Sequence, residues 1–222
     1  MPTTTTYSPT LDGRVRHEGT IWSWDTGHDA TDGTAANYTS SGITTSYATD
    51  NGNNAGKYKV MFRSFLLFDT SNIPSGNVVT AATLHLVALQ DSIANAYSDS
   101  ITVTLTNPAS TSAIVVGDWD QAGGKVSQVH QSADVAISSI TANSSTYTVF
   151  TLNAAGRSNV SKTGISKFGI ATVRDVDDQE PTWANDQHVQ VNWASSNHST
   201  SGIRPYLTVT HELGFTPKAI IF

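Results

Sequence analysis

Five aspartates in two short segments have the chemistry that a calcium ion requires. Asp25, Asp29 and Asp32 stand in DTGHDATDG, and Asp118 and Asp120 stand in GDWDQ. Ca²⁺ takes about six to eight hard oxygen ligands, and closely spaced carboxylates on a bent loop can supply them. Their spacing does not match an EF-hand loop. Calcium is therefore the one cofactor that the pattern favours; the alternative is that these residues only make turns.

A further acidic group follows at residues 175 to 180, with the sequence DVDDQE. It holds four carboxylates, Asp175, Asp177, Asp178 and Glu180. Like charges this close repel one another unless they are solvated or bound to a cation. We interpret the segment as an exposed acidic loop.

Four aromatic residues are candidates for stacking on a sugar ring. Trp119 and Trp183 stand among acidic turn residues, and Tyr38 and Tyr47 lie in a long polar segment, residues 25 to 57. Exposed rings stack on sugars while neighbouring Asn, Asp, Gln and Arg side chains supply hydrogen bonds. We predict that these four rings bind a glycan. The alternative is burial in the core, where Trp is usually found.

Motifs of nucleophilic or metal-dependent catalysis are missing from the sequence. No two of the seven histidines have the H-x-x-x-H spacing of a zinc protease, and no G-x-S-x-G segment occurs. Cysteine is absent, which excludes disulfides, thiolate metal sites and a cysteine nucleophile. We therefore predict a protein that is not an enzyme.

Charge and composition narrow the choice of partners. Only 14% of the 222 residues are charged, the formal net charge is −6, and no basic cluster occurs. A nucleic-acid partner requires Lys and Arg contacts to phosphate, so we expect none. No apolar run approaches the length of a membrane span, so we expect no membrane insertion.

Short strands and many turns must position these residues. Apolar or alternating runs predict strands near 14–24, 59–69, 79–89, 100–108, 113–117, 133–142, 145–153, 165–175, 188–195 and 204–213, with a weaker candidate at 42–48. In the strand at 79–89 the residues Ala82, Leu84, Leu86 and Ala88 share one face. One short helix is predicted near 153–162, capped by Asn153. Strand–helix alternation does not occur, which indicates an all-β, two-sheet antiparallel β-sandwich of the jelly-roll type.

The strongest signal, RSFLLFDTSNIPSGNVVTAATLHLVAL at residues 63 to 89, is scaffold. Arg63 and Asp69 flank its apolar run, and we expect them to pair with each other or to cap the strand ends. The whole chain divides into an extended arm at residues 1–12, a sandwich domain at 13–211 and a tail strand at 212–222. Any function must lie in the loops and ends that this scaffold positions.

The same stretch resembles the hallmark of DNRLRE-type domains, in which an Arg precedes an LLxFD strand, SxIPxG and TxAxLxL. The segment FTLNAAGRSNVSKTGISKFGIATVRD and the later IRPYLTVTH resemble the second half of such domains. The resemblance spans roughly residues 14 to 211, with residues 25 to 57 as an insertion. It implies a sandwich like a carbohydrate-binding module, which is not catalytic, occurs in secreted and cell-surface proteins and in some cases binds polysaccharide or calcium.

The end of the chain, ELGFTPKAIIF, resembles a segment of bacteriophage tail and other structural proteins. The start, MPTTTTYSPT, does not have the pattern of a signal peptide. We therefore expect a structural, decoration or adhesion module on a virion or fibre surface, working through protein–protein contacts, with a secreted carbohydrate-binding module as the alternative. Its partners would be other virion or fibre subunits, including further copies of this chain in a homo-oligomer, and polysaccharide. Strand addition predicts subunit contacts at residues 3 to 9 and at Ala219, Ile220, Ile221 and Phe222.

Overall fold

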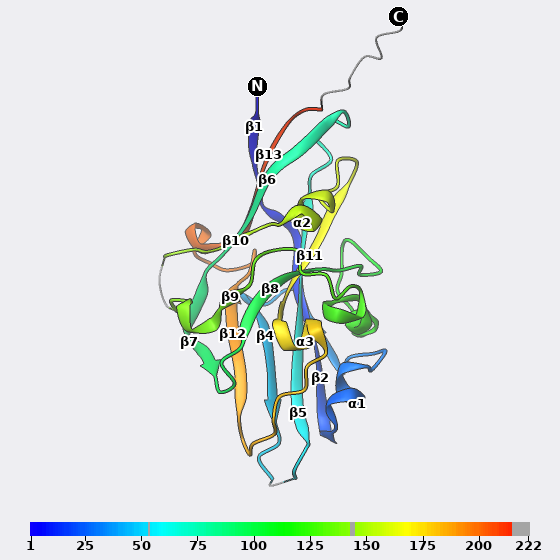
Figure 1. Ribbon diagram of the computed structural model, residues 1–222, viewed down its shortest axis with the longest axis vertical. Helices are drawn as coiled ribbons and strands as arrows, with labels where there is room; N and C mark the ends of the chain where they lie inside the picture. The colour runs from blue at the N-terminus through cyan, green and yellow to red at the C-terminus, as the bar shows by residue number, and fades with distance from the viewer. Residues whose placement is uncertain (53, 143–144, 215–222) are drawn as a thin grey trace, which may run out of the picture.

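The computed structural model describes residues 1–52, 54–142 and 145–214. It is an all-β sandwich, as predicted, in which every ladder between the described strands is antiparallel (Figure 1). The predicted tail contacts at Ala219 to Phe222 lie outside the described residues. No helix in the described ranges is long and apolar enough to cross a membrane.

Two sheets make up the sandwich. The smaller has the order β1-β13-β6-β10, and the larger has the order β7-β12-β4-β5-β11-β8-β9, with β2 pairing β5 and β3 pairing β2. The strands are β1 (Thr3–Tyr7), β2 (Pro9–Trp22), β3 (Ala35–Asn37), β4 (Gly42–Thr49), β5 (Tyr58–Asp69), β6 (Asn77–Leu86), β7 (Ala88–Asn95), β8 (Ser100–Leu105), β9 (Val135–Ala136), β10 (Thr148–Thr151), β11 (Ile165–Thr172), β12 (His188–Ala194) and β13 (Tyr206–Leu213).

Helices are short and lie in the connections. They are α1 (Trp24–His28), α2 (Ala154–Ser158) and α3 (Val173–Asp177), with 3₁₀ turns η1 (Val116–Gln121), η2 (Gly123–Lys125), η3 (Ile137–Ser139) and η4 (Ser201–Ile203). The predicted helix is α2, and its cap is confirmed, because the Asn153 side chain accepts a hydrogen bond from the Gly156 amide. The sequence did not predict α1 or α3.

Strand β5 is the centre of the larger sheet. It pairs with β2, with β4 at its start and with β11 at its end. Its last apolar residues, Phe65 to Phe68, are fully buried, which confirms a strand covered on both faces.

Strand β6 shows the predicted alternation, and after it the chain passes from the smaller sheet to the larger one. Ala82, Leu84 and Leu86 are buried, and the residues between them are half-buried. Ala88 is also buried, but it begins β7 in the larger sheet. The two sheets meet in the core, where the Phe150 ring of β10 packs edge-on against the Trp193 ring of β12, with centroids 5.9 Å apart.

The weak strand candidate at 42–48 is confirmed as β4, whereas residues 113–117 form no strand and the predicted strand at 133–142 holds only the two residues of β9. Strand β4 lies inside the larger sheet between β5 and β12, and seven of its eight residues are buried. Its side chains are largely Thr and Ser, so hydropathy does not reveal it. β-branched Thr nevertheless suits a strand. Thr45 donates to the Ile170 carbonyl and Thr49 donates to the Ala184 carbonyl, so both buried hydroxyls are satisfied.

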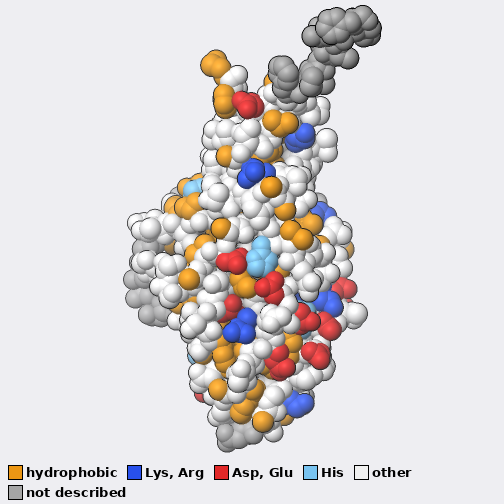
Figure 2. Space-filling view, in the orientation of Figure 1, with side chains coloured by type: hydrophobic (Ala, Val, Ile, Leu, Met, Phe, Trp, Pro, Cys, Tyr) orange, Lys and Arg blue, Asp and Glu red, His pale blue; other side chains and the backbone are white. Residues whose placement is uncertain are grey.

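The N-terminal arm is also a strand. Residues Thr3 to Tyr7 pair with β13 in continuous register and form one edge of the smaller sheet. Figure 1 places this edge at the end of the molecule that carries the N-terminus. In the space-filling view most of the surface is uncharged, and the acidic side chains gather mainly in the half that holds α1 and α3 (Figure 2).

Candidate functional site

An open face of the larger sheet carries a row of polar side chains that comes from separate strands. Arg14 of β2 stands opposite Asn37 of β3 and Ser64 of β5, and Thr44 of β4 stands opposite Asn192 of β12. The Ser64 hydroxyl donates to the Thr44 carbonyl at 2.7 Å, which joins the two halves of the row. The register of the sheet therefore aligns these residues across it.

Arg14 links the row through side-chain hydrogen bonds. Its Nη1 donates to the Thr44 hydroxyl, which in turn donates to Asn192 Oδ1 at 2.7 Å. Because the Ser64 side chain is small, the guanidinium can extend across β5 to reach β4. Its carbon also lies 5.3 Å from the centre of the Phe62 ring, within the range of a cation–π contact.

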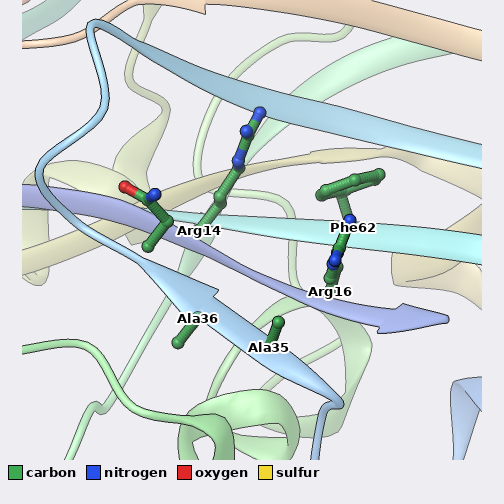
Figure 3. A pocket seen from close by; sticks show the side chains of 6 residues that line it. Arg14, Arg16, Ala35, Ala36 and Phe62 are labelled. Carbon is green, nitrogen blue, oxygen red and sulfur yellow. The ribbon is translucent and has the colours of Figure 1, made fainter.

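Two hollows have Arg14 in their lining. The first, about 220 Å³, is the one drawn in Figure 3 and is lined by Arg14, Arg16, Ala35, Ala36, Asn37 and Phe62. Ala35 stands opposite Arg16 in the register, so a methyl group occupies a position where a larger side chain would fill the space. The second hollow, about 250 Å³, is lined by Arg14, Ser40, Ser41, Gly42, Thr44, Leu89 and Asn192.

The charge of the first hollow is positive in a protein whose net charge is −6. Arg16 pairs with Glu18 at 2.8 Å, but both side chains are nearly half exposed, so water screens the pair. Within the described ranges Arg14 has no carboxylate within ion-pair distance. Burial, followed by the charge of Arg16, lowers the pKa of Arg14.

The chemistry of this face is that of recognition. Its hollows present guanidinium, amide and hydroxyl donors together with one aromatic ring. Neither hollow is lined by a carboxylate or an imidazole, the groups that most often transfer protons. The arrangement can hold a polar ligand with oxygen acceptors along the sheet.

Two of the predicted glycan contacts are buried. Trp119 has no exposed surface: its indole N–H donates to the Gly27 carbonyl at 3.0 Å, and the Arg63 guanidinium lies 4.4 Å from the ring centre. Tyr47 also has no exposed surface and donates its hydroxyl to Asp99 at 3.0 Å. The prediction that these rings are accessible to a sugar was wrong, because each is a packing residue whose polar atom is satisfied inside the fold.

The other two rings are more accessible but do not form one surface. Tyr38 is 38% exposed and lies beside Gly13, which pairs with Phe65 on β5. Trp183 is half-buried and donates its indole N–H to the carbonyl of Lys57, next to the start of the same strand. Glycan binding by these two residues remains a prediction, and Tyr38 is the one that adjoins the row of Arg14 and Asn37 in the chain.

The five aspartates predicted to bind calcium do not come together. No group of three or more His, Cys, Asp or Glu side chains among the described residues is placed to hold a metal ion. Asp118 is buried and accepts hydrogen bonds from the amides of Ala109 and Val115, both at 2.8 Å, so it organises its own loop.

The other four aspartates are structural or exposed. Asp29 pairs with Lys125 at 3.0 Å, and hydrogen bonds from Lys125 and then His28 lower its pKa. Asp120 is half-buried and accepts from Gln121, whereas Asp25 and Asp32 are exposed. The carboxylate pattern therefore marks turns and short helices here, which was the alternative interpretation.

The acidic segment at 175–180 is not simply an exposed loop. Asp175 is 2% exposed and forms an ion pair with Arg63 at 2.6 Å, so Arg63 does not pair with Asp69. Asp69 instead accepts from the Ser71 amide. The remaining carboxylates also have partners: Asp177 contacts His130, Asp178 accepts from the Trp24 indole, and Glu180 accepts from the Tyr58 hydroxyl.

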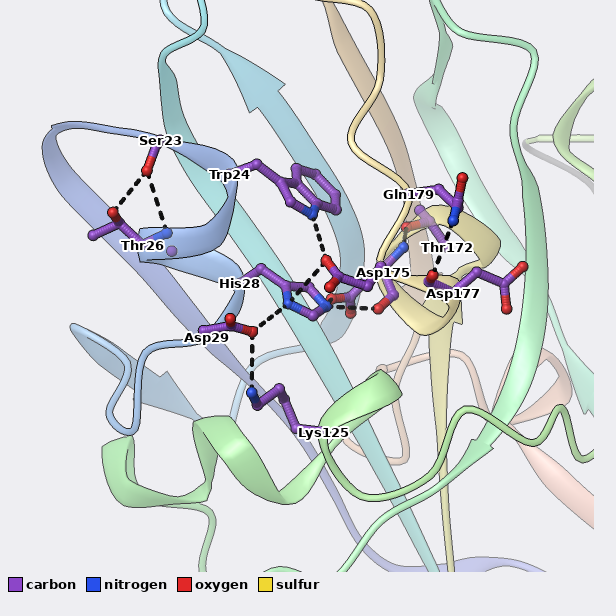
Figure 4. Close-up of polar contacts among 12 residues, drawn as sticks. Ser23, Trp24, Thr26, His28, Asp29, Lys125, Thr172, Asp175, Asp177 and Gln179 are labelled. Carbon is purple, nitrogen blue, oxygen red and sulfur yellow. Dashed lines mark hydrogen bonds and ion pairs between the residues drawn. The ribbon is translucent and has the colours of Figure 1, made fainter.

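These contacts join three connections around one buried arginine. Besides Asp175, Arg63 donates to the carbonyls of Trp119 and His28 at 3.0 and 3.1 Å. His28 contacts Asp29 through Nδ1 and the Asp175 carbonyl through Nε2, and these contacts are drawn in Figure 4. The result is a structural centre that fixes α1, η1 and α3 on the sheet.

Comparisons with known proteins add little to this geometry. No protein-family model and no curated protein matches the sequence. One solved structure that the search returned is titled "Structure of infectious bursal disease virus Gx strain", with 9% identity and a TM-score of 0.20. The match covers 97% of this chain and 63% of that chain, less than two thirds of its length. A score this low carries no argument about fold or function.

Proposed function

We propose that the protein is a non-enzymatic structural or decoration module on a virion or fibre surface, and that it acts through protein–protein contacts. The observation that supports this most is the free outer edge of β1, an exposed strand whose one described neighbour is β13. A free strand edge presents unpaired N–H and C=O groups that can pair with another chain.

The other edges of the described sheets are shorter or less regular. Strands β3, β9 and β10 have three, two and four residues. Strand β7 pairs across a register shift, and β2 has charged residues and two register shifts. The β1 segment TTTTY has no charge, no proline and a continuous register, so it lacks the features with which proteins usually protect an edge.

The side chains of β1 suit pairing with a second copy. Thr6 lies in a row with Thr208, Thr83 and Thr151 that crosses all four strands of the smaller sheet. If two β1 strands pair antiparallel with full overlap, Thr5 faces Thr5, and Thr4 of each copy faces Thr6 of the other. Facing threonines are among the favourable cross-strand pairs.

Charge substitutions test this assembly. The double variant Thr4→Lys/Thr6→Lys places lysine opposite lysine twice, whereas Thr4→Lys/Thr6→Glu places lysine opposite glutamate twice. We expect sedimentation equilibrium to show self-association of the wild type, at least roughly ten-fold weaker association of the first variant, and recovery in the second.

Val149→Lys/Thr151→Lys is the matched control, because it adds the same two lysines at exposed positions of β10, the opposite edge of the sheet. A wild type that stays monomeric at millimolar concentration would contradict the proposal, as would equal association of the two double variants.

A secreted carbohydrate-binding module is the second candidate. The two hollows lined by Arg14 favour it, because ligand sites are concave and hold a few placed polar groups. This candidate predicts a monomer that is retarded in gels containing acidic polysaccharide. Turnover of a glycan by the isolated protein would contradict both candidates.

A further inference from the structure

The first hollow on the open face has a shape and a charge that the fold itself does not require. Arg14 and Arg16 are two residues apart on β2, so their side chains leave the same face of the strand. Both line the hollow, together with Asn37 and the Phe62 ring. Two guanidinium groups at one small cavity would repel each other unless an anion or water separates them.

Within the described residues, the carboxylates nearby do not neutralise this charge. Glu18 pairs with Arg16, but Arg14 makes no ion pair and uses Nη1 for the Thr44 hydroxyl. Arg63, which supports the fold, is by contrast paired with the carboxylate of Asp175. Arg14 is half-buried and lacks such a partner.

We propose that the hollow between Arg14 and Arg16 binds the anionic group of an acidic sugar, a carboxylate or a sulfate ester. A guanidinium presents several N–H donors in one plane, and this plane matches the oxygens of a carboxylate or sulfate. Asn37, whose Oδ1 accepts from the amides of Thr39 and Ser40, offers its side-chain N–H for a neighbouring sugar hydroxyl. Phe62 provides an apolar surface for the ring that carries the group.

The two hollows can accommodate one extended ligand. Arg14 lines both, so a chain of sugars that places its anionic group in the first hollow can continue past Arg14 into the second. This inference deepens the second candidate function, and it does not depend on assembly through β1. The two can therefore fail separately, because their tests use different variants and different measurements.

Isothermal titration with defined oligosaccharides tests the site. The probes are an oligogalacturonate, a sulfated galactan oligosaccharide and a neutral galactan oligosaccharide of similar length. We expect the wild type to bind at least one acidic probe, to bind the neutral one at least about ten-fold more weakly, and to lose affinity as salt rises. The two acidic probes decide whether the group is a carboxylate or a sulfate.

Three variants connect binding to the hollow. Arg14→Gln removes the guanidinium and should weaken binding of the acidic probe about ten-fold or more. Ala35→Leu leaves both arginines in place but fills the space opposite Arg16, so it should weaken binding by steric exclusion. Arg204→Gln is the matched control: it removes the same charge after η4, where Arg204 donates to the His198 carbonyl and lines neither hollow.

Thermal unfolding separates a local effect from misfolding. The acidic probe should raise the melting temperature of the wild type and of Arg204→Gln, and should raise that of Arg14→Gln clearly less at the same probe concentration. Equal binding of acidic and neutral probes, no binding of any probe by the wild type, or equal loss in Arg14→Gln and Arg204→Gln would each overturn the proposal.

Discussion

Removing the Asp175 carboxylate should destabilise the protein far more than removing a surface carboxylate that is also ion-paired. Arg63 has no exposed side-chain surface and Asp175 has 3%. Nε and Nη2 of Arg63 reach the two carboxylate oxygens at 2.6 to 3.2 Å. In Asp175→Ala the guanidinium keeps only the carbonyls of Trp119 and His28 and has no counter-ion.

The size of the effect follows from burial rather than from distance. Breaking a buried ion pair by removing one partner costs about 3–5 kcal/mol, because the remaining charge stays buried without compensation. For a domain of this size each kcal/mol lowers the melting temperature by about 2–4 °C, so Asp175→Ala should melt roughly 6–20 °C below the wild type. The expected cost is a large part of the total stability of a typical domain.

Glu18→Ala is the matched control. Glu18 pairs with Arg16 at 2.8 Å, but its side chain is 46% exposed. Exposed pairs contribute about 0–1 kcal/mol, so this variant should unfold almost like the wild type. Urea unfolding followed by tryptophan fluorescence measures both variants in one assay, and the midpoints can be compared if the slopes agree.

A double variant tests whether the loss of stability comes from the unpaired buried charge of Arg63. Arg63→Met/Asp175→Leu removes both charges and should be more stable than Asp175→Ala, because no unpaired charge stays buried. The reasoning is refuted if Asp175→Ala lies within about 1 kcal/mol of Glu18→Ala, or if the double variant is the least stable of the three.

Two other predictions concern protonation and backbone geometry. Burial lowers the pKa of His130, but the hydrogen bonds from its ring to Asp177 and Asp134 outweigh burial, so the pKa of His130 is raised. His130→Gln should therefore lose stability relative to the wild type below the unfolded pKa of about 6.5, and the difference should disappear as pH rises through the folded pKa; equal loss in urea unfolding at pH 5.5 and pH 9 would contradict this. Gly123 has φ +61°, and a Cβ there would lie 2.7 Å from an Asp175 carboxylate oxygen, so Gly123→Ala should cost at least about 2 kcal/mol. Gly56 has φ +70° in open space, so Gly56→Ala should cost only about 1 kcal/mol, and similar unfolding midpoints for the two variants would refute the steric argument.

Local pattern was enough to predict the fold class and several of its elements. The apolar run at Phe65 to Phe68, the alternation in β6 and the cap at Asn153 are signals within a few residues of one another. Such signals predict well because strand and helix periods and helix caps depend on neighbours in sequence. The run at 42–48 was only a weak strand candidate, since Thr and Ser are polar in any hydropathy pattern, and its place inside the sheet was decided by the strands on either side.

The partners of individual side chains were decided by the tertiary structure alone. Arg63 is next to a core strand in sequence, yet its counter-ion is Asp175, which stands 112 residues later. Trp119 is surrounded by acidic residues in sequence, yet it is buried because that arginine lies over its ring. The row that contains Arg14 exists only through the register of five strands, which is fixed by non-local pairing, and no short stretch of sequence records which residues a sheet places side by side.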